Sequence, residues 1–380
     1  MLSMRAPTLG HYPLPNLRFA YLEVDSWSRV PSLQLFLNPG LTSVCIGFPN
    51  AQPDLYRPAL VALIPTEDLT HLQLNFMAGD DLPPLHTLLD EASETLRSVS
   101  LHGRLSTATI DKLLQLPHLR CLEVELPEAR ISPPAVVFPS LEKLGVVYEE
   151  TGSWIHILQE IPLWELDVTF TGSSSAHLQT LGSSLLDSNA ERTLTSLKCT
   201  SRNTIPLTEA GILPLLSFGK LTILDVTTSC DEGQCGAQLN DSIVSELATA
   251  LPQLTSLGLG SIPCKASTPD VTVASLVALS TNCIDLDFLR IHFDAIDIVT
   301  RSTHGSSQVD KFTCKLHTLS VGSQPLPSNH DDILLVTSAI LRIFPHLETI
   351  SSTEGDWNQV KEGVEMFRKP PRIDPLPTEN

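Results

Sequence analysis

Residues 117–146 read PHLRCLEVELPEARISPPAVVFPSLEKLGV, and this stretch decides the fold. It contains one aliphatic spacing twice, as Leu119-Leu122-Val124 and as Leu141-Leu144-Val146. The last two residues of each triplet are two positions apart, so they point to the same face of a β-strand. Each triplet therefore predicts a short strand that buries one face.

The same triplet, L-x-x-L-x-L with aliphatic substitutions, recurs along the chain at intervals of 22 to 33 residues. Phe19-Leu22-Val24 is a candidate for an additional first strand. This pattern at this period is the signature of leucine-rich repeats, in which each repeat covers the apolar face of its neighbour. The sequence predicts an α/β fold, a leucine-rich-repeat solenoid with a curved parallel sheet of about 12 repeats and helices or irregular segments on its convex face. The other copies are Leu41-Val44-Ile46, Leu69-Leu72-Leu74, Leu96-Val99-Leu101, Leu163-Leu166-Val168, Leu194-Leu197-Cys199, Leu221-Leu224-Val226, Leu254-Leu257-Leu259, Leu286-Leu289-Ile291, Leu316-Leu319-Val321 and the degraded Leu347-Ile350-Ser352.

Intervals near 30 residues leave room for a helix after the strand, and apolar residues at helical spacing appear there. These sets follow Ser106 and Thr107, Asn240 and Asp241, and Asp331, so each set has a possible N-cap before it. We expect an irregular segment over 1–18, the solenoid over 19–352, a capping helix over 353–369 and a disordered tail over 370–380. The helical sets are Ile110, Leu113 and Leu114; Val244, Leu247 and Leu251; Ile333, Val336, Ile340 and Phe344; and, in the capping helix, Trp357, Val360, Val364 and Phe367.

The triplet also predicts which side chains face solvent, because the residues between the buried ones point to the opposite, concave face of the sheet. Four carboxylates fall there in the middle of the chain and form a candidate acidic stripe, interrupted by two lysines. An acidic solenoid places some carboxylates on every face, so charge alone does not identify the partner site. The stripe is therefore one candidate for that site. The candidate concave residues are Glu123, Glu125, Lys143, Glu165, Asp167, Lys198 and Asp225, with Phe288, Arg290 and His292 as a more aromatic and basic patch.

The net negative charge of the chain argues against nucleic acids and membranes as partners. The formal net charge is -19 at pH 7, so most of the surface repels nucleic acid phosphates and anionic membranes. The N-terminal residues contain no apolar run typical of a signal peptide, and the eight cysteines contain no CxxC pair. Only Cys230 and Cys235 flank one short loop. We expect a cytoplasmic or nuclear protein that binds protein partners, with neither nucleic acid nor membrane among them.

The sequence lacks several common motifs of catalytic, nucleotide-binding and metal-binding sites. There is no G-x-S-x-G, no G-x-x-x-x-G-K-[ST] and no G-x-G-x-x-G, and the histidines lack H-x-x-x-H spacing. The sequence thus predicts no catalytic residue, no metal site and no cofactor. We expect a binding protein rather than an enzyme.

The segments PHLRCLEV at 117–124, FPSLEKLGV at 138–146 and LPQLTSLGL at 251–259 resemble the repeats of fungal F-box proteins with leucine-rich repeats. The segment LQLFLNPGLTSV at 33–44 resembles the region that follows the F-box in that family, and the resemblance runs from Phe19 to Arg368. It implies that the repeats recruit a substrate while an F-box docks the adaptor of a ubiquitin ligase. The residues before Phe19 are too few and too proline-rich to form that F-box. The resemblance therefore assigns adaptor docking to no residue of this sequence.

Two other readings of the sequence remain open. A standalone repeat scaffold or regulator, for example of a GTPase, would use the same concave face. An enzyme built on the solenoid would need a convergent pocket, which sequence alone does not reveal.

Overall fold

The structure is a computed structural model of the chain. It describes residues 14, 16–24, 38, 40–48, 53–64, 66, 68–76, 83–126, 140–148, 158, 161–172, 176–203, 207–229, 237–261, 270–302, 313–322, 326–352 and 357–368. The predicted tail over 370–380, most of the 1–18 segment, and Cys230 and Cys235 lie outside these residues.

Contacts within the chain divide it into two units, where the sequence suggests one solenoid over 19–352. Unit 1 comprises Met1–Tyr148 with Gly152–Leu163, and unit 2 comprises Glu149–Thr151 with Trp164–Asn380. Each unit is described by itself.

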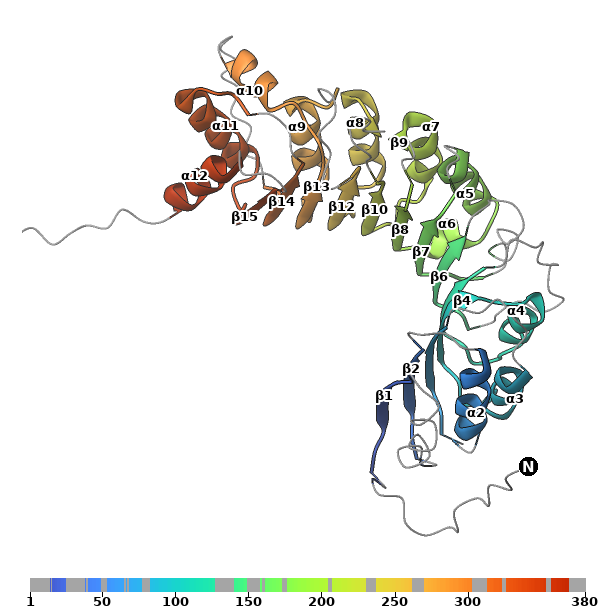
Figure 1. The fold of residues 1–380 in the computed structure, drawn as a ribbon. Coiled ribbons are helices and arrows are strands. Elements are labelled where there is room, and N and C mark those ends of the chain that lie inside the picture. The colour runs from blue at the N-terminus through green and yellow to red at the C-terminus, as the bar shows by residue number, and fades with distance from the viewer. Residues whose placement is uncertain are drawn as a thin grey trace, which may run out of the picture. The chain divides into compact units, whose positions relative to one another are not determined.

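Unit 1 contains a parallel sheet whose strands follow one another in chain order (Figure 1). Helices α2, α3 and α4 pack against one face of this sheet. The strands are β1 (Phe19–Glu23), β2 (Ser43–Gly47), β3 (His71–Asn75), β4 (Ser98–Arg104), β5 (Cys121–Glu125) and β6 (Lys143–Tyr148), and the helices are α2 (Pro53–Leu63), α3 (Pro83–Glu91) and α4 (Thr107–Leu114).

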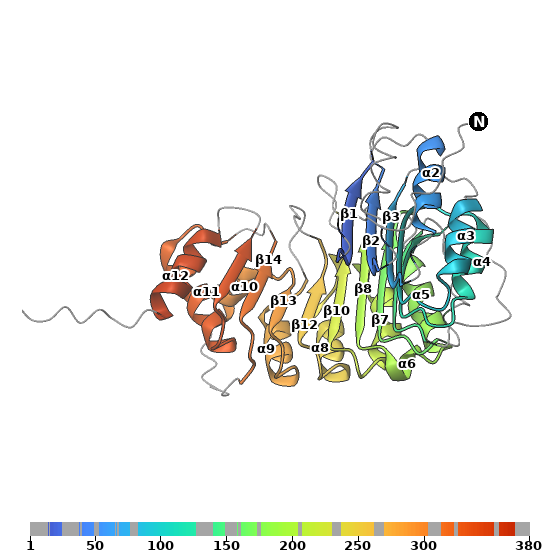
Figure 2. The same ribbon diagram turned by 90° about the horizontal axis from the view of Figure 1, so that it is seen from below.

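Unit 2 repeats this plan, with a parallel sheet in chain order and helices along one of its faces (Figures 1 and 2). Its sheet contains β7 (Glu165–Phe170), β8 (Ser196–Ser201), β10 (Ile223–Thr227), β12 (Ser256–Leu259), β13 (Phe288–Arg290), β14 (Thr318–Val321) and β15 (Thr349–Ser352), while β9 (Leu207–Thr208) and β11 (Ala237–Gln238) form a separate pair. The helices are α5 (Ala176–Leu186), α6 (Ala190–Thr193), α7 (Glu209–Ile212), the 3₁₀ helix η3 (Leu213–Ser217), α8 (Asp241–Ala250), α9 (Val273–Asn282), α10 (Ala295–Ser302), α11 (His330–Ile343) and α12 (Asn358–Arg368). The predicted α/β fold with parallel strands is confirmed.

The aliphatic triplets form the core of both units. From Leu41 to Val321 every triplet residue is buried, and in the last copy Leu347 and Ile350 are buried while Ser352 is half-buried. The triplet proposed for the first strand is wrong by two residues. In the ladder Ala20 pairs with Val44 and Leu22 with Ile46, so the aligned triplet is Leu17-Ala20-Leu22. Phe19 instead points away from the core and is 58% exposed.

A ladder of hydrogen bonds at the strand starts ties successive strands together. The residue after the first leucine of the triplet accepts, through its carbonyl oxygen, bonds from two backbone N–H groups at the start of the next strand. Where the residue after the first leucine of the next triplet is threonine, its hydroxyl donates a third bond to the same carbonyl. Thr222 Oγ1 donates to the Thr195 carbonyl and Thr255 Oγ1 donates to the Thr222 carbonyl, both at 3.0 Å. Thr42, Thr70 and Thr195 make the same bond, at 2.9–3.1 Å. This ladder helps to fix the register of strands whose connecting segments differ in length.

The helices begin where short polar side chains cap them. Ser106 caps α4 and Asn240 caps α8, as predicted, because each side-chain oxygen accepts a backbone N–H of the first turn. The cap of α11 is Asn329, so the prediction of Asp331 is wrong; Asp331 lies in the first turn. In α12, Val360 and Val364 are buried, whereas Phe367 is 62% exposed and does not join the core.

Candidate interaction face

One face of each sheet carries helices and the other does not, as Figure 2 shows for the described residues. We call the second face the open face. It is formed by the side chains that alternate with the buried triplet residues along each strand. A parallel sheet normally has both faces covered, because its crossover helices lie on both sides. The open face is therefore the first place to look for a binding function.

Unit 1 contributes Glu123, Glu125 and Lys143 to this face. Glu123 and Lys143 are exposed and Glu125 is half-buried, all on β5 and β6. Glu123 accepts a 3.0 Å hydrogen bond from Ser100 Oγ on β4, and Ser100 also contacts the His102 ring at 2.9 Å. Gly145 lies beside Glu123 in the ladder and leaves room for its side chain. The carboxylate is thus oriented by its neighbours rather than free to rotate.

Unit 2 contributes Glu165 and Asp167 on β7, Lys198 on β8 and Asp225 on β10. The first three are exposed and Asp225 is half-buried. Lys198 lies between Asp167 and Asp225 in the ladder, so the carboxylates alternate with a cation across the strands. The four carboxylates of the predicted acidic stripe are divided between the units, two in each.

Arg290 and His292 lie on the open face of unit 2, but the expectation that they are exposed is wrong. Each is only 8% exposed, while Phe288 is half-buried. Arg290 Nη2 contacts the Asp225 carboxylate and donates to Thr227 Oγ1 at 2.5 Å. Thr227 in turn donates to Asp225 Oδ1 at 2.9 Å. These three side chains close one network over β12, where the intervening residue is Gly258.

His292 is buried by a similar arrangement one strand further along. Its Nε2 is 2.6 Å from the carbonyl oxygen of Ser261, and its ring lies where a side chain at position 322 would project, a place that Gly322 leaves empty. Burial lowers the pKa of His292, since the charged ring would lose its hydration, and the nearby Arg290 cation lowers it further; the Ser261 bond opposes both. The fold therefore favours the neutral form of the His292 ring.

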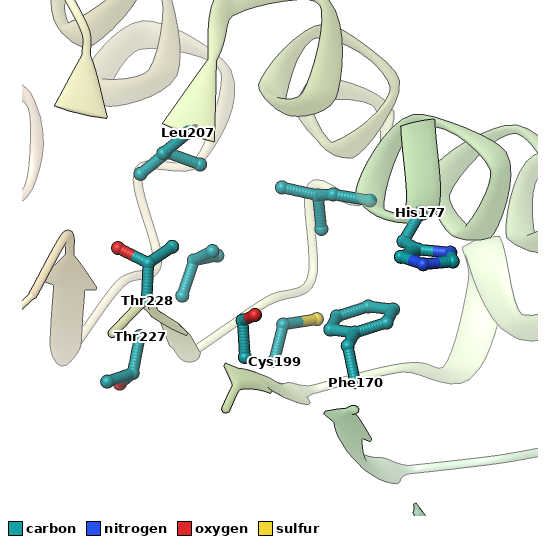
Figure 3. A pocket seen from close by; sticks show the side chains of 9 residues that line it. Phe170, His177, Cys199, Leu207, Thr227 and Thr228 are labelled. Carbon is teal, nitrogen blue, oxygen red and sulfur yellow. The ribbon is translucent and has the colours of Figure 1, made fainter. Parts of the chain in front are cut away.

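A small pocket lies within unit 2 at the ends of β7, β8 and β10 (Figure 3). The ring of His177, on α5, stacks on Phe170 with 5.6 Å between centroids and 14° between planes. The space inside the pocket for a water-sized sphere is about 20 Å³, enough to hold an ordered water. Besides these two residues it is lined by Leu178, Cys199, Ser201, Leu207, Val226, Thr227 and Thr228.

Four buried thiols, those of Cys45, Cys199, Cys283 and Cys314, show no activation. Burial raises the pKa of Cys45, Cys199 and Cys314, and it raises that of Cys283 to about 12. A nucleophilic thiol needs the opposite shift, because the thiolate is the reactive form. The Cys283 and Cys314 sulfurs instead point at backbone carbonyls of the preceding repeat, at 3.5–3.7 Å. These cysteines pack the repeat junctions.

The described residues contain no group of three His, Cys, Asp or Glu side chains that could hold a metal ion. Among them, too, no helix has the length and apolar character needed to cross a membrane. No protein-family model matches the chain, and no curated protein matches it either.

The sequence analysis missed several features of the open face. It assigned Phe19 to the core, although Phe19 and Tyr21 both belong to the open face. It also missed the roles of Thr227 and Gly258 around Arg290. The column of threonines at the strand starts was missed as well, although the sequence shows it: the residue after the first leucine of the triplet is threonine at five strands.

Proposed function

We propose that the chain is a non-catalytic protein-binding module built as a leucine-rich-repeat solenoid of about 12 repeats, and that it binds its partner on the open face. The observation that carries the proposal is the sheet face that no described helix covers. Its exposed side chains include Glu123 and Lys143 in unit 1 and Glu165, Asp167 and Lys198 in unit 2. Such a face suits a folded protein or a peptide better than an apolar small molecule.

We further propose, from the resemblance of its repeats, that the module serves as the substrate-recognition part of an F-box-type ubiquitin ligase adaptor. In this role the chain recruits a target and performs no chemistry. Contact with the ligase would require an F-box, and no residue of this chain is assigned to one. The ligase role and the binding role are therefore tested separately.

Proximity labelling with the intact chain in cells tests the binding role. The test variants reverse Glu123 and Glu125 in unit 1, and Glu165 and Asp167 in unit 2, to Lys. The matched control reverses Glu246 on α8 and Glu362 on α12, which are exposed carboxylates of the helices. Because two charges reverse in every variant, a change in overall charge affects all three alike. Loss of the same partners in a test variant but not in the control supports the proposal. A partner list that neither pair alters rejects the open face.

Co-purification with the adaptor subunit tests the ligase role. We expect the chain alone to leave the adaptor unbound and a fusion to an F-box to bind it together with the partner of the open face. If the fusion binds the adaptor but the labelled partner is not ubiquitinated, the ligase role is wrong and a standalone scaffold is the better description.

A further inference from the structure

The outermost strand of unit 1, β1, has one backbone edge that no described strand pairs with. On its inner edge, the Arg18 carbonyl accepts N–H groups from Thr42 and Ser43, and Val24 N–H donates to the Gly47 carbonyl at 2.9 Å. Backbone groups alternate in direction along a strand. The N–H and C=O groups of Phe19, Tyr21 and Glu23 therefore point outward, away from β2.

Among the described residues, the apolar core is also less completely covered at this end. Leu17 and Leu22 are only half-buried. Their counterparts in the next five repeats are at most 3% exposed. The counterparts each lie between two other strands, whereas no described strand lies on the outer side of β1. An additional strand there would remove these leucines from water. The counterparts are Leu41, Leu69, Leu96, Leu119 and Leu141 for Leu17, and Ile46, Leu74, Leu101, Val124 and Val146 for Leu22.

The open face of β1 has a distinct chemistry. Phe19 and Tyr21 are 58% and 59% exposed, and the exposed Glu23 accepts a 3.0 Å hydrogen bond from the Tyr21 hydroxyl. Two aromatic faces beside a carboxylate favour a Lys or Arg side chain, through cation–π contact and charge pairing. The net charge of -19 favours a basic partner over a longer range.

We propose that β1 accepts an extended segment of a partner protein as an additional parallel strand, with apolar residues toward Leu17 and Leu22 and basic residues toward Phe19, Tyr21 and Glu23. The hydrogen-bond ladder sets the register of the added strand. The N–H groups of Thr42 and Ser43 both donate to the Arg18 carbonyl. By the same pattern, the N–H groups of Arg18 and Phe19 would both donate to one carbonyl of the added strand. This site lies beyond the proposed binding function, because it adds a strand to the edge of the sheet and uses none of the carboxylates tested there, Glu123, Glu125, Glu165 and Asp167.

A second copy of the chain fits the edge less well. Two β1 edges related by a twofold axis pair antiparallel, and two copies that each carry a charge of -19 repel one another. A second copy also brings Glu23 rather than a basic residue to the aromatic pair. Self-association is therefore treated as a competing result of the test.

The probe is a synthetic acetylated octapeptide of alternating Val and Lys, labelled with a fluorophore and titrated with the full chain at 0.15 M salt, an ionic strength that screens nonspecific attraction. We expect saturable binding, together with slower amide exchange at Phe19, Tyr21 and Glu23. A peptide of the same composition in blocks, Val-Val-Lys-Lys repeated, cannot keep valine on one face. It should bind about tenfold more weakly, the factor that about 1.4 kcal/mol produces.

Peptide N-methylation tests the strand geometry without changing the protein. In a parallel added strand the core-facing valines direct their N–H groups toward β1, as Val24 does toward β2. N-methylation of the valines should therefore abolish binding, and N-methylation of the lysines should leave it within about threefold. The opposite result would mean antiparallel addition and would overturn the proposed register.

A protein variant completes the test. Tyr21→Pro removes an outward N–H while leaving the bonds to β2, since proline is tolerated on the free side of an edge strand. It should abolish peptide binding, whereas Thr249→Val, on the exposed side of α8, should not change it. Thermal unfolding of Tyr21→Pro checks that the fold is retained. Failure of the unmodified peptide to bind, equal binding of the block peptide, or sedimentation of the free chain as a dimer through β1 each contradicts the proposal.

Discussion

Arg290 on β13 pairs with Asp225 on β10, two strands away, by crossing β12 at Gly258. The crossing is possible because the residue between them has no side chain. A Cβ at position 258 would lie 2.8 Å from Asp225 Oδ1 and 2.9 Å from Arg290 Nη2. One glycine thus allows an ion pair to form flat against the sheet, with the arginine side chain only 10% exposed.

Gly258→Ala should therefore separate the pair and leave Arg290 poorly matched in its buried position. We expect a loss of about 1–3 kcal/mol in the free energy of unfolding, measured by urea denaturation. Gly219→Ala is the matched control, since its Cβ would approach nothing closer than 3.9 Å. Equal stability of the two variants would show that the crossing contributes nothing.

The strands and core were largely predictable from the sequence, because burial on one face imposes a two-residue period that survives irregular loops. The first strand shows the limit of that rule. Phe19-Leu22-Val24 fits the pattern with large residues, whereas the residue at the second core position is the small Ala20. Only pairing with β2 reveals the register, and pairing is a property of the fold rather than of a local segment.

The candidate site was predictable to a smaller extent. Alternation along a strand assigns Arg290 and His292 to the open face correctly, but it does not give their exposure. Their burial depends on Gly258 in β12 and on Gly322 directly after β14, some 30 residues away in sequence. A contact across strands of that separation leaves no local signal.

The threonine ladder predicts a measurable contribution from single hydroxyl groups. Thr222→Val removes the donor to the Thr195 carbonyl while preserving the shape of the side chain, and that carbonyl keeps its two backbone donors. The free energy of unfolding should fall by about 0.5–1 kcal/mol. Thr249→Val removes a hydroxyl bond of similar length, 2.9 Å, from the exposed side of α8 and should cost less. A larger effect at Thr249 would argue against the ladder.

Gly103 creates an irregularity in β4 that other residues cannot reproduce. Its φ is +144°, a region that residues with a side chain rarely adopt, and its Cβ would lie 2.2 Å from the Phe76 carbonyl oxygen. The ladder with β5 shifts register at the same place, between Leu101 and Arg104. Gly103→Ala should lower the free energy of unfolding by about 2 kcal/mol or more. Stability within about 0.5 kcal/mol of the Gly219→Ala control would exclude strain at this residue.

His292 should make the protein less stable in mild acid. Its pKa is lowered in the folded state, chiefly by burial, from an ordinary value of 6.5. Above that value the ring is neutral in both states, so its full contribution to stability is present. As the pH falls through 6.5 the unfolded chain binds a proton first, and stability decreases until the folded state is also protonated. Urea denaturation at several pH values between about 7.5 and 5 should show this decrease, and His292→Gln should reduce its slope while the exposed His346→Gln should not. Parallel pH profiles for the wild type and His292→Gln would place the titrating group elsewhere.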